Sequence, residues 1–228
     1  LAAFLQACTP LIAGVFSIVW LRKHYTGLFK LPPVDEIINS YKEGWSIFVS
    51  SLAVNLYTAT NVVVLGMLTN NVIVGYYSAA DKLITCVRRG IYAVSDAIYP
   101  FISKMMKDDI PKGLRFIKKQ LFLYLLIGLV GCTSLFFFSD TIVKLLFGAD
   151  YELTVDVLRI LSFVPLAVAI STVFGEETML PLNMNSAYSR TLVLGAFFSL
   201  ISIFPLCYLW GAKGVAITML LTEFLIMS

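Results

Sequence analysis

Seven long apolar runs take up most of the sequence. About 20 apolar residues in a helix cross the roughly 30 Å hydrocarbon core of a bilayer, and the runs approach or exceed this length. A segment inside a bilayer must satisfy its backbone hydrogen bonds internally, so we expect each run to be helical. Only 14% of the residues are charged, against about 25% in soluble domains. The predicted fold class is therefore all-α, a polytopic helical membrane protein. The runs lie at about 1–21, 45–68, 73–101, 120–138, 157–175, 191–210 and 212–228.

Both ends of the chain fall inside apolar runs, and the chain begins at Leu1 without an initiator Met. We therefore expect a fragment of a longer chain. Residues 1–21 lack the basic start and the small-residue cleavage site of a signal peptide.

Lysine and arginine predict the orientation, because cytoplasmic loops carry an excess of both. Eleven of them fall in the segments 22–44, 102–119 and 176–190, and three, Lys144, Arg159 and Lys213, fall on the other side. The first group of loops is therefore expected in the cytoplasm. Residues 22–44, which contain Pro32 and Pro33, are read as a cytoplasmic connector, and residues 141–148 as a short amphipathic turn on the outer face.

No residue set for metal or disulfide chemistry stands out. The four cysteines lie singly in apolar runs, and His24 is the sole histidine. Neither a disulfide framework nor a zinc site is expected, and we predict no catalytic group and no cofactor.

The run 73–101 is unusual because it carries five charged residues. Polar side chains recur in it at steps of three or four and so share one helix face. The preceding run has a stripe of its own, and only 69–72 separates the two runs, so we expect an antiparallel hairpin. Two facing polar stripes indicate an interior polar surface rather than a lipid-facing one. The stripes are Ser78, Asp81, Thr85, Arg88, Tyr92, Ser95 and Tyr99 on one helix, and Ser51, Asn55, Thr58 and Asn61 on the other.

Arg88 and Arg89 lie near mid-span, where an arginine costs about 2.5–3.5 kcal/mol on insertion scales. They could form an ion pair that fixes helix register, or they could bind an anionic substrate. Guanidinium suits phosphate because its planar fork donates paired hydrogen bonds. Lys82 could instead reach the membrane interface. We predict that the cavity is lined by Arg88, Arg89, Asp81, Lys82, Tyr92, Asn55, Thr58 and Asn61.

Three other acidic positions require an interpretation. Glu223 is a lone carboxylate inside the last run, and it is a candidate for proton or sodium coupling. Asp96 is a second candidate, although it could simply pair with Arg88 or Arg89. Glu176 and Glu177 fall in a predicted loop, where we expect them to be solvated.

At this point the sequence resembles the polysaccharide transporter branch of the multidrug/oligosaccharidyl-lipid/polysaccharide exporter superfamily, which includes the O-antigen flippases. The resemblance covers most of residues 44–224 and depends on the order of several short matches. These are Gly75-Tyr76-Tyr77-Ser78-Ala79-Ala80-Asp81-Lys82, Ala97-Ile98-Tyr99-Pro100, Leu146-Phe147-Gly148 with Tyr151, Leu158-Arg159-Ile160-Leu161, and Gly211-Ala212-Lys213-Gly214-Val215-Ala216 with Thr222-Glu223.

The resemblance implies two six-helix lobes around a central cavity, as in the MATE transporters of the same superfamily. Residues 1–21 would then be the last helix of the first lobe, 22–44 the connector and 45–228 the C-terminal six-helix lobe. It also implies a flippase in the bacterial inner membrane. The implied substrate is an oligosaccharide linked to undecaprenyl pyrophosphate. The other implied partners of the protein are membrane lipids and the polysaccharide polymerase machinery. No nucleic-acid partner is expected.

Three alternatives remain open. A multidrug or organic-cation antiporter should favour acidic and aromatic cavity residues, whereas the charged run has three basic and two acidic residues. A lipid II flippase also handles a pyrophosphate. A polyprenyl-linked glycosyltransferase would need catalytic carboxylates at one membrane face, and the sole adjacent aspartates, Asp108 and Asp109, lie in a basic loop. We therefore expect a transporter rather than an enzyme.

Overall fold

The computed structural model describes residues 13–20, 23, 33–148 and 150–228, with the backbone alone at residues 39, 42 and 43. The chain divides into two compact units, Leu1–Lys42 and Glu43–Ser228. In the first unit, residues 13–20 are helical, whereas the rest of the predicted helix 1–21 lies outside the described residues. The helix α2 begins at Val34, so the predicted connector 22–44 is helical from that residue onward.

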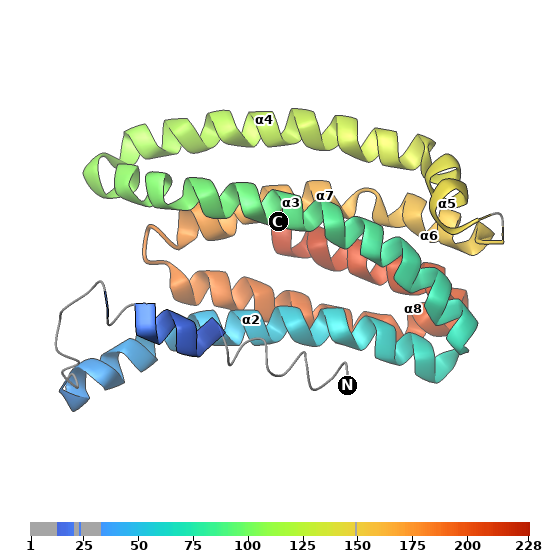
Figure 1. The fold of residues 1–228 in the computed structure, drawn as a ribbon, viewed down its shortest axis with the longest axis horizontal. Helices are drawn as coiled ribbons and strands as arrows, with labels where there is room; N and C mark the ends of the chain where they lie inside the picture. Colours follow the sequence, from blue (N-terminus) through green and yellow to red (C-terminus); the bar gives the residue numbers. More distant parts are fainter. Residues whose placement is uncertain (1–12, 21–22, 24–32, 149) are drawn as a thin grey trace. The chain divides into compact units, whose positions relative to one another are not determined.

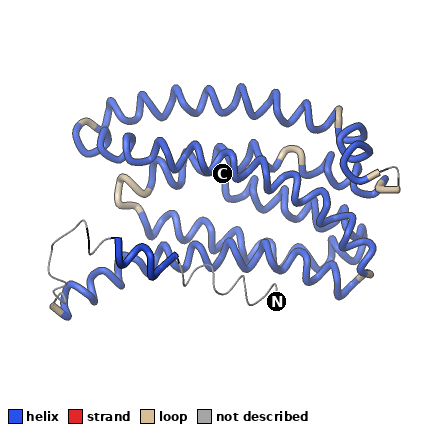
Figure 2. The backbone as a smooth tube through the Cα atoms, in the orientation of Figure 1, coloured by secondary structure: helices blue, strands red, loops and turns tan. Residues whose placement is uncertain are grey.

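Every regular element in the described part of the chain is a helix (Figures 1 and 2). Among the described residues, four helical stretches are long and apolar enough to cross a membrane: Gly44–Leu68, Ile110–Phe137, Glu152–Met179 and Asn185–Met227. The predicted fold class, a polytopic helical membrane protein, is therefore confirmed. The elements are α2 (Val34–Leu68), α3 (Asn71–Asp108), α4 (Ile110–Phe137), α5 (Ser139–Phe147), α6 (Glu152–Leu161), α7 (Val164–Phe174), the π-helix η1 (Gly175–Met179) and α8 (Asn185–Met227).

The charged run forms α3, which pairs with α2 in the predicted hairpin (Figure 1). Asn70 caps α3, since its side chain accepts hydrogen bonds from the backbone N–H groups of Val72 and Ile73 at 3.1 and 3.0 Å. Leu65 of α2 and Tyr77 of α3 then meet in the main core. At about 1.5 Å per residue, α3 is long enough to cross the bilayer beside α2.

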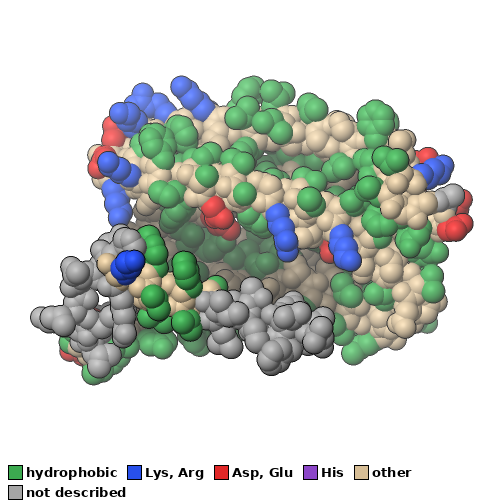
Figure 3. Space-filling view, in the orientation of Figure 1, with side chains coloured by type: hydrophobic (Ala, Val, Ile, Leu, Met, Phe, Trp, Pro, Cys, Tyr) green, Lys and Arg blue, Asp and Glu red, His purple; other side chains and the backbone are tan. Residues whose placement is uncertain are grey.

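The predicted loop 102–119 is wrong, because α3 continues to Asp108 and α4 starts at Ile110. Asp109 caps α4 by accepting a hydrogen bond from the Lys112 N–H at 3.1 Å. Lysine and arginine are good helix formers, so a basic segment can extend the helices beyond the apolar region. In Figure 3 several Lys and Arg side chains gather at the end of the molecule where α3 meets α4, and others lie elsewhere on the same face.

The predicted span 157–175 consists of two helices. α6 ends at Leu161 and α7 begins at Val164, with Pro165 in the first turn of α7. Proline fits a first turn because it lacks the N–H that would remain unpaired there. The predicted outer turn is α5, which ends at Phe147 and is followed by Gly148 with a φ of 100° that favours glycine.

The last two predicted spans are the two legs of α8, which is interrupted at Gly211, where φ is 53° and ψ is −128°. Gly195 on the first leg faces Ile226 and Thr222 on the second. The second leg therefore returns alongside the first.

The core holds α3 in place. α3 packs against α4, α6, α7 and α8. One buried cluster joins Tyr77 and Ile84 of α3 to Leu158 of α6 and to Ile203 and Met219 of the two α8 legs. Burial of such side chains contributes about 1.5–3 kcal/mol each in water. In a membrane the same close packing supplies dispersion energy instead. The polar face of α3 is thereby fixed toward α2 and the second leg of α8.

Candidate substrate cavity

A cavity of about 620 Å³ lies among α2, α3, α7, η1 and α8, within residues 47–226. Polar and aromatic side chains make up most of its wall. The lining residues are Ile47, Ser50, Ser51, Val54, Asn55, Tyr57, Thr58, Arg88, Tyr92, Ser95, Asp96, Tyr99, Ser171, Thr172, Glu176, Leu180, Tyr188, Leu192, Glu223 and Ile226.

The predicted stripe on α2 supplies one wall. Ser51, Asn55 and Thr58 line the cavity. The Asn55 side-chain amide donates to the Ser51 carbonyl at 2.8 Å, and the Thr58 hydroxyl donates to the Val54 carbonyl at 2.8 Å. Asn61, the fourth member of the stripe, is not part of the lining and is only 1% exposed.

The predicted stripe on α3 supplies the opposite wall, with Arg88, Tyr92, Ser95 and Tyr99. The Arg88 side chain is 14% exposed. Its Nε and Nη1 atoms are buried and have no hydrogen-bond partner in the described part of the chain. An arginine with unused donors inside a polar cavity is suited to bind an anion.

The predicted cavity residues therefore separate into two groups. Those in the lining are Asn55, Thr58, Arg88 and Tyr92, whereas Arg89, Asp81, Lys82 and Asn61 are outside it. The two candidates for ion coupling, Asp96 and Glu223, also belong to the lining. Arg89 and Lys82 are exposed and Asp81 is half-buried.

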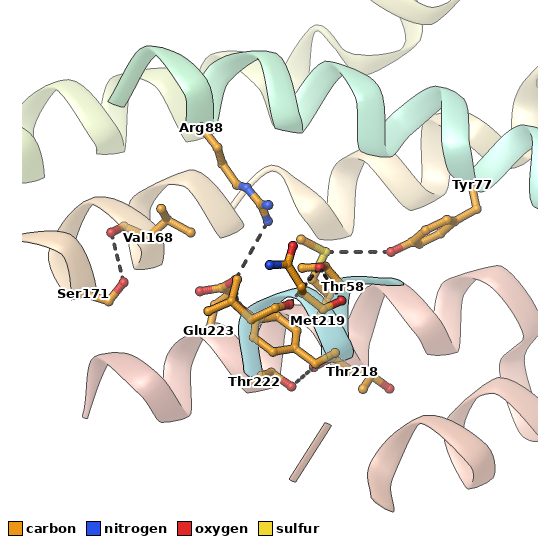
Figure 4. A network of polar contacts seen from close by, with 12 residues as sticks. Thr58, Tyr77, Arg88, Val168, Ser171, Thr218, Met219, Thr222 and Glu223 are labelled. Atoms are coloured by element: carbon orange, nitrogen blue, oxygen red, sulfur yellow. Dashed lines mark hydrogen bonds and ion pairs between the residues drawn. The ribbon is translucent and has the colours of Figure 1, made fainter. Parts of the chain in front are cut away.

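Arg88, Glu223 and Tyr57 form a network across the cavity from α3, α8 and α2. Arg88 Nη1 lies 3.9 Å from Glu223 Oε1 (Figure 4). The Tyr57 hydroxyl donates to the same Oε1 atom at 3.0 Å. Glu223 is only 4% exposed, so its charge is balanced mainly by Arg88 and Tyr57.

The sequence interpretation missed the two glutamates of η1. Glu176 and Glu177 were expected in a solvated loop, but Glu177 is fully buried and Glu176 lines the cavity. The Tyr188 hydroxyl donates to Glu176 Oε1 at 3.3 Å. Tyr57 and Tyr188 were also missed, because Tyr57 is an aromatic residue in an apolar run and Tyr188 falls in the segment 176–190 that was predicted as a loop. The adjacent pair Glu176–Glu177 just after such a run was the available signal.

The charge of the cavity differs from that of α3 as a whole. Among the lining residues the cation is Arg88, whereas Asp96, Glu176 and Glu223 are acidic. The net positive character of the charged run does not extend into the cavity, because Lys82 and Arg89 lie elsewhere. In the described part of the chain, no three His, Cys, Asp or Glu side chains come together as a metal site would need.

Comparisons with known proteins agree on one family. Residues 1–106 match the model of a family described as "Polysaccharide biosynthesis protein". A protein of Escherichia coli strain K12 named "Putative O-antigen transporter" is 31% identical over 229 residues, which cover 100% of this chain and 55% of that protein. A protein of the same name from Shigella dysenteriae is 29% identical over 99% of this chain and 56% of its own length.

A third relative is the capsular polysaccharide biosynthesis protein CapF of Staphylococcus aureus, 28% identical over 77% of this chain and 44% of its own length. The chain thus spans about half the length of the O-antigen transporter relatives that it matches. No solved structure gives a significant match.

Proposed function

Because this chain belongs to the polysaccharide transporter family, we propose that the full-length protein is a flippase for lipid-linked oligosaccharides. It moves a sugar unit attached to undecaprenyl pyrophosphate from the cytoplasmic to the outer leaflet of a bacterial inner membrane. It makes and breaks no covalent bond during this movement. The flipped unit then serves polymerase machinery in the outer leaflet.

The observation that carries the proposal is Arg88 in the cavity. Its Nε and Nη1 atoms have no hydrogen-bond partner among the described residues, and its contact with Glu223 is too long for a hydrogen bond. A pyrophosphate carries several acceptor oxygens, which a guanidinium can bind through two parallel hydrogen bonds. Arg88 would compensate the anionic charge of the substrate as it passes the apolar centre of the membrane.

The rest of the lining suits the sugar. Tyr57, Tyr92, Tyr99 and Tyr188 line the cavity, and each offers a flat apolar face with a hydroxyl at the tip. The hydroxyl, amide and carboxylate groups beside them can exchange hydrogen bonds with sugar hydroxyls. The cavity of about 620 Å³ lies within the range of about 300–1,000 Å³ typical of small-ligand sites.

Movement across the membrane requires access from each side in turn. We propose that this chain supplies the C-terminal lobe and that the lobe rocks against an N-terminal lobe around the cavity. The polyprenyl tail would remain in the bilayer while the pyrophosphate and sugar pass through the polar interior.

One observation favours a second candidate, an organic-cation antiporter of the same superfamily. Asp96, Glu176 and Glu223 place three carboxylates in the cavity lining against the single cation Arg88. Carboxylates beside aromatic rings can bind a cationic ligand through charge and cation–π contacts.

A complementation experiment tests the proposal. The full-length chain is expressed in a bacterial strain that lacks its own O-antigen flippase and makes the matching sugar unit. We expect the wild type to restore surface polysaccharide, and Arg88→Gln to lower it at least tenfold at equal membrane levels. Arg89→Gln is the matched control, because Arg89 is exposed and lies outside the cavity lining. We expect it to remain close to wild type.

The two candidates give different results. If Arg88→Gln restored polysaccharide as well as the wild type, Arg88 would not be the phosphate contact. If the wild type failed with its matching sugar unit and instead expelled cationic dyes, the antiporter candidate would replace the flippase.

A further inference from the structure

The cavity lining on α3 extends from Arg88 in one direction only. The structure describes all of α3, and its lining residues are Arg88, Tyr92, Ser95, Asp96 and Tyr99, with none before Arg88. At about 1.5 Å per residue, Asp96 lies about 12 Å along the helix axis from Arg88. A ligand that fills the cavity with its phosphate at Arg88 must therefore extend beside Asp96.

The two ends of the cavity differ in charge. At one end Arg88 faces Glu223, so a positive and a negative charge lie together. The other end contains Asp96 of α3 and Glu176 of η1, which lie close enough to repel each other. Neither of these two carboxylates has an ion pair among the described residues. A ligand that enters this acidic end meets two negative charges.

Three uncharged polar side chains complete the acidic end. Thr172 of α7 lines the cavity, is only 3% exposed, and has no side-chain hydrogen bond to any other described residue. Tyr99 and Tyr188 also belong to the lining, and the Tyr188 hydroxyl donates to Glu176 Oε1 at 3.3 Å. Buried hydroxyls usually have a hydrogen-bond partner, so the Thr172 hydroxyl indicates a polar ligand at this end.

This combination of groups fits a sugar. Carboxylates accept hydrogen bonds from sugar hydroxyls, and a threonine hydroxyl can donate or accept one. Tyrosine rings can cover the apolar C–H faces of a sugar ring while their hydroxyls remain available to polar groups. The acidic end can therefore contact both the polar edges and the apolar faces of the ligand.

The same groups exclude two other parts or kinds of substrate. A polyprenyl tail at the acidic end would bury Asp96 and Glu176 against hydrocarbon, which is strongly unfavourable for a charged group. A sugar that carries a carboxylate would place a third negative charge beside these two, and like charges at short distance repel each other. An uncharged sugar meets neither penalty.

We propose that Asp96, Tyr99, Thr172, Glu176 and Tyr188 form a sugar subsite that selects uncharged sugars against uronic acids and other acidic sugars. The inference rests on the proposed flippase function, which supplies a sugar linked to a pyrophosphate. Arg88 binds the pyrophosphate, and the sugar extends from it toward Asp96. Asp96 and Glu176 determine the specificity, because they accept hydrogen bonds from a neutral sugar and repel an acidic one.

The test measures the binding of synthetic ligands to the purified full-length protein by isothermal titration calorimetry. One ligand is farnesyl pyrophosphate without a sugar. A second carries a disaccharide of glucose, and a third carries the same disaccharide with glucuronic acid as its outer residue. The second and third ligands differ only in the carboxylate that replaces a hydroxymethyl group, so their comparison separates charge from size and shape.

The wild type should bind the neutral sugar ligand roughly tenfold or more tightly than the acidic one. Asp96→Asn with Glu176→Gln keeps side chains that form hydrogen bonds but removes both charges. The acidic ligand should therefore gain affinity, which a misfolded variant could not produce, and most of the preference should disappear. Asp108→Asn with Asp140→Asn is the matched control, because it also removes two negative charges but lies outside the cavity lining. It should keep the preference of the wild type.

The contribution of the rings is tested separately with Tyr99→Leu. This variant removes a flat ring but no charge, so both sugar ligands should bind more weakly while the affinity for farnesyl pyrophosphate stays unchanged. Tyr208→Leu is the control, because Tyr208 is 81% exposed and lies outside the lining. An equal loss of affinity for all the ligands in Tyr99→Leu would contradict the assignment of Tyr99 to the sugar subsite.

Failure of this inference is distinguishable from failure of the proposed function. If farnesyl pyrophosphate did not bind the wild type, or bound Arg88→Gln equally well, the flippase proposal would fail and the sugar subsite with it. If it bound through Arg88 but the neutral and acidic sugar ligands had equal affinities, the sugar subsite alone would be overturned. Persistence of the full preference in Asp96→Asn with Glu176→Gln would overturn it as well.

Discussion

Arg88 on α3 and Glu223 on α8 face each other at 3.9 Å between Nη1 and Oε1. This distance permits Coulomb attraction but exceeds that of a hydrogen bond. Both side chains are largely buried, at 14% and 5% exposed. The guanidinium is therefore held near a carboxylate without being bound tightly to it, and an arriving anion can approach Arg88 without first breaking a hydrogen bond.

A double-mutant cycle on this pair should show clear coupling. Arg88→Gln or Glu223→Gln alone leaves the other charge buried without its counter-charge, which costs about 1–3 kcal/mol or more. The double variant removes both charges, so it should be less destabilised than the sum of the single variants. We expect a coupling energy of at least about 1 kcal/mol, measured from thermal unfolding of the purified full-length protein.

The exposed pair Lys213–Asp156 is a matched control for the cycle. Its Nζ–Oδ2 distance of 2.7 Å is shorter, but the side chains are 45% and 44% exposed. Solvent screens such pairs, and their coupling is typically about 0.2–1 kcal/mol. We expect Lys213→Gln with Asp156→Asn to couple more weakly than the buried pair, and to lose most of that coupling at high salt. Equal coupling energies in the two pairs would contradict the expectation that burial strengthens the Arg88–Glu223 interaction.

Tyr57 should contribute to stability through its bond to Glu223. Tyr57→Phe keeps the ring and removes the hydroxyl that donates to Oε1 at 3.0 Å. A hydrogen bond to a charged group contributes about 1.5–3 kcal/mol, so the Tm should fall measurably. Tyr208→Phe is the control, because Tyr208 is 81% exposed. A Tyr57→Phe protein as stable as the Tyr208→Phe protein would show that water replaces this bond.

Helical periodicity was sufficient to predict much of the cavity. Asn55 and Thr58 on one helix, with Arg88 and Tyr92 on the next, were expected on facing polar stripes, and the structure brings all four to one lining. The steps of three and four residues place such side chains on one face. The functional role of these residues stays a prediction.

The charge count of the run was a poorer guide to the cavity lining than its periodicity. Lys82 and Arg89 each follow a stripe residue by one position, which rotates them by about 100° around a helix of 3.6 residues per turn. They lie outside the cavity although they belong to the same charged run, and so does the stripe residue Asp81. Their contribution to the net charge of α3 says little about the cavity.

The η1 glutamates show a different limit. A π-helix has a wider turn than an α-helix, so the α-helical period does not apply to its residues. Glu176 lines the cavity, whereas the neighbouring Glu177 is buried and accepts a hydrogen bond from Ser95 of α3. Only tertiary packing of η1 against α3 and α4 determines this arrangement, and the local sequence reads as a polar loop.

Gly214 should be essential to the hairpin between the two legs of α8. A Cβ atom at this position would collide with the backbone carbonyl of Leu206. Backbone atoms cannot move aside as a flexible side chain can, so Gly214→Ala should destabilise the protein by about 1–3 kcal/mol. Gly131→Ala is the control, because nothing lies within 4 Å of its added Cβ.

Thermal unfolding of the two alanine variants checks this prediction. Alanine favours a helix over glycine, so Gly131→Ala should be as stable as the wild type or slightly more stable. If Gly214→Ala behaved in the same way, the legs would have to pack less closely than the structure shows.

The orientation of the helices can be tested at two exposed acids. One precedes the first residue of α4 and the other follows α5, beyond the last residue of α4. Asp108 lies at the end of α3 among the basic residues of the α3–α4 turn, and Asp150 lies between α5 and α6. Because lysine and arginine concentrate on the cytoplasmic side, we expect Asp108→Cys to face the cytoplasm and Asp150→Cys to face the outside. Each cysteine is introduced into the full-length chain after its native cysteines are replaced by alanine.

A membrane-impermeant maleimide distinguishes the two sides. In intact spheroplasts, Asp150→Cys should be labelled and Asp108→Cys should not. After lysis, both should react, which confirms that each thiol is accessible. The opposite pattern in spheroplasts would reverse the orientation and place the basic α3–α4 turn outside. Arg88 lies between the two positions, so its proposed contact with the pyrophosphate is compatible with either result. The reversed orientation would contradict the proposed direction of transport, because the substrate would then enter the cavity from the opposite side.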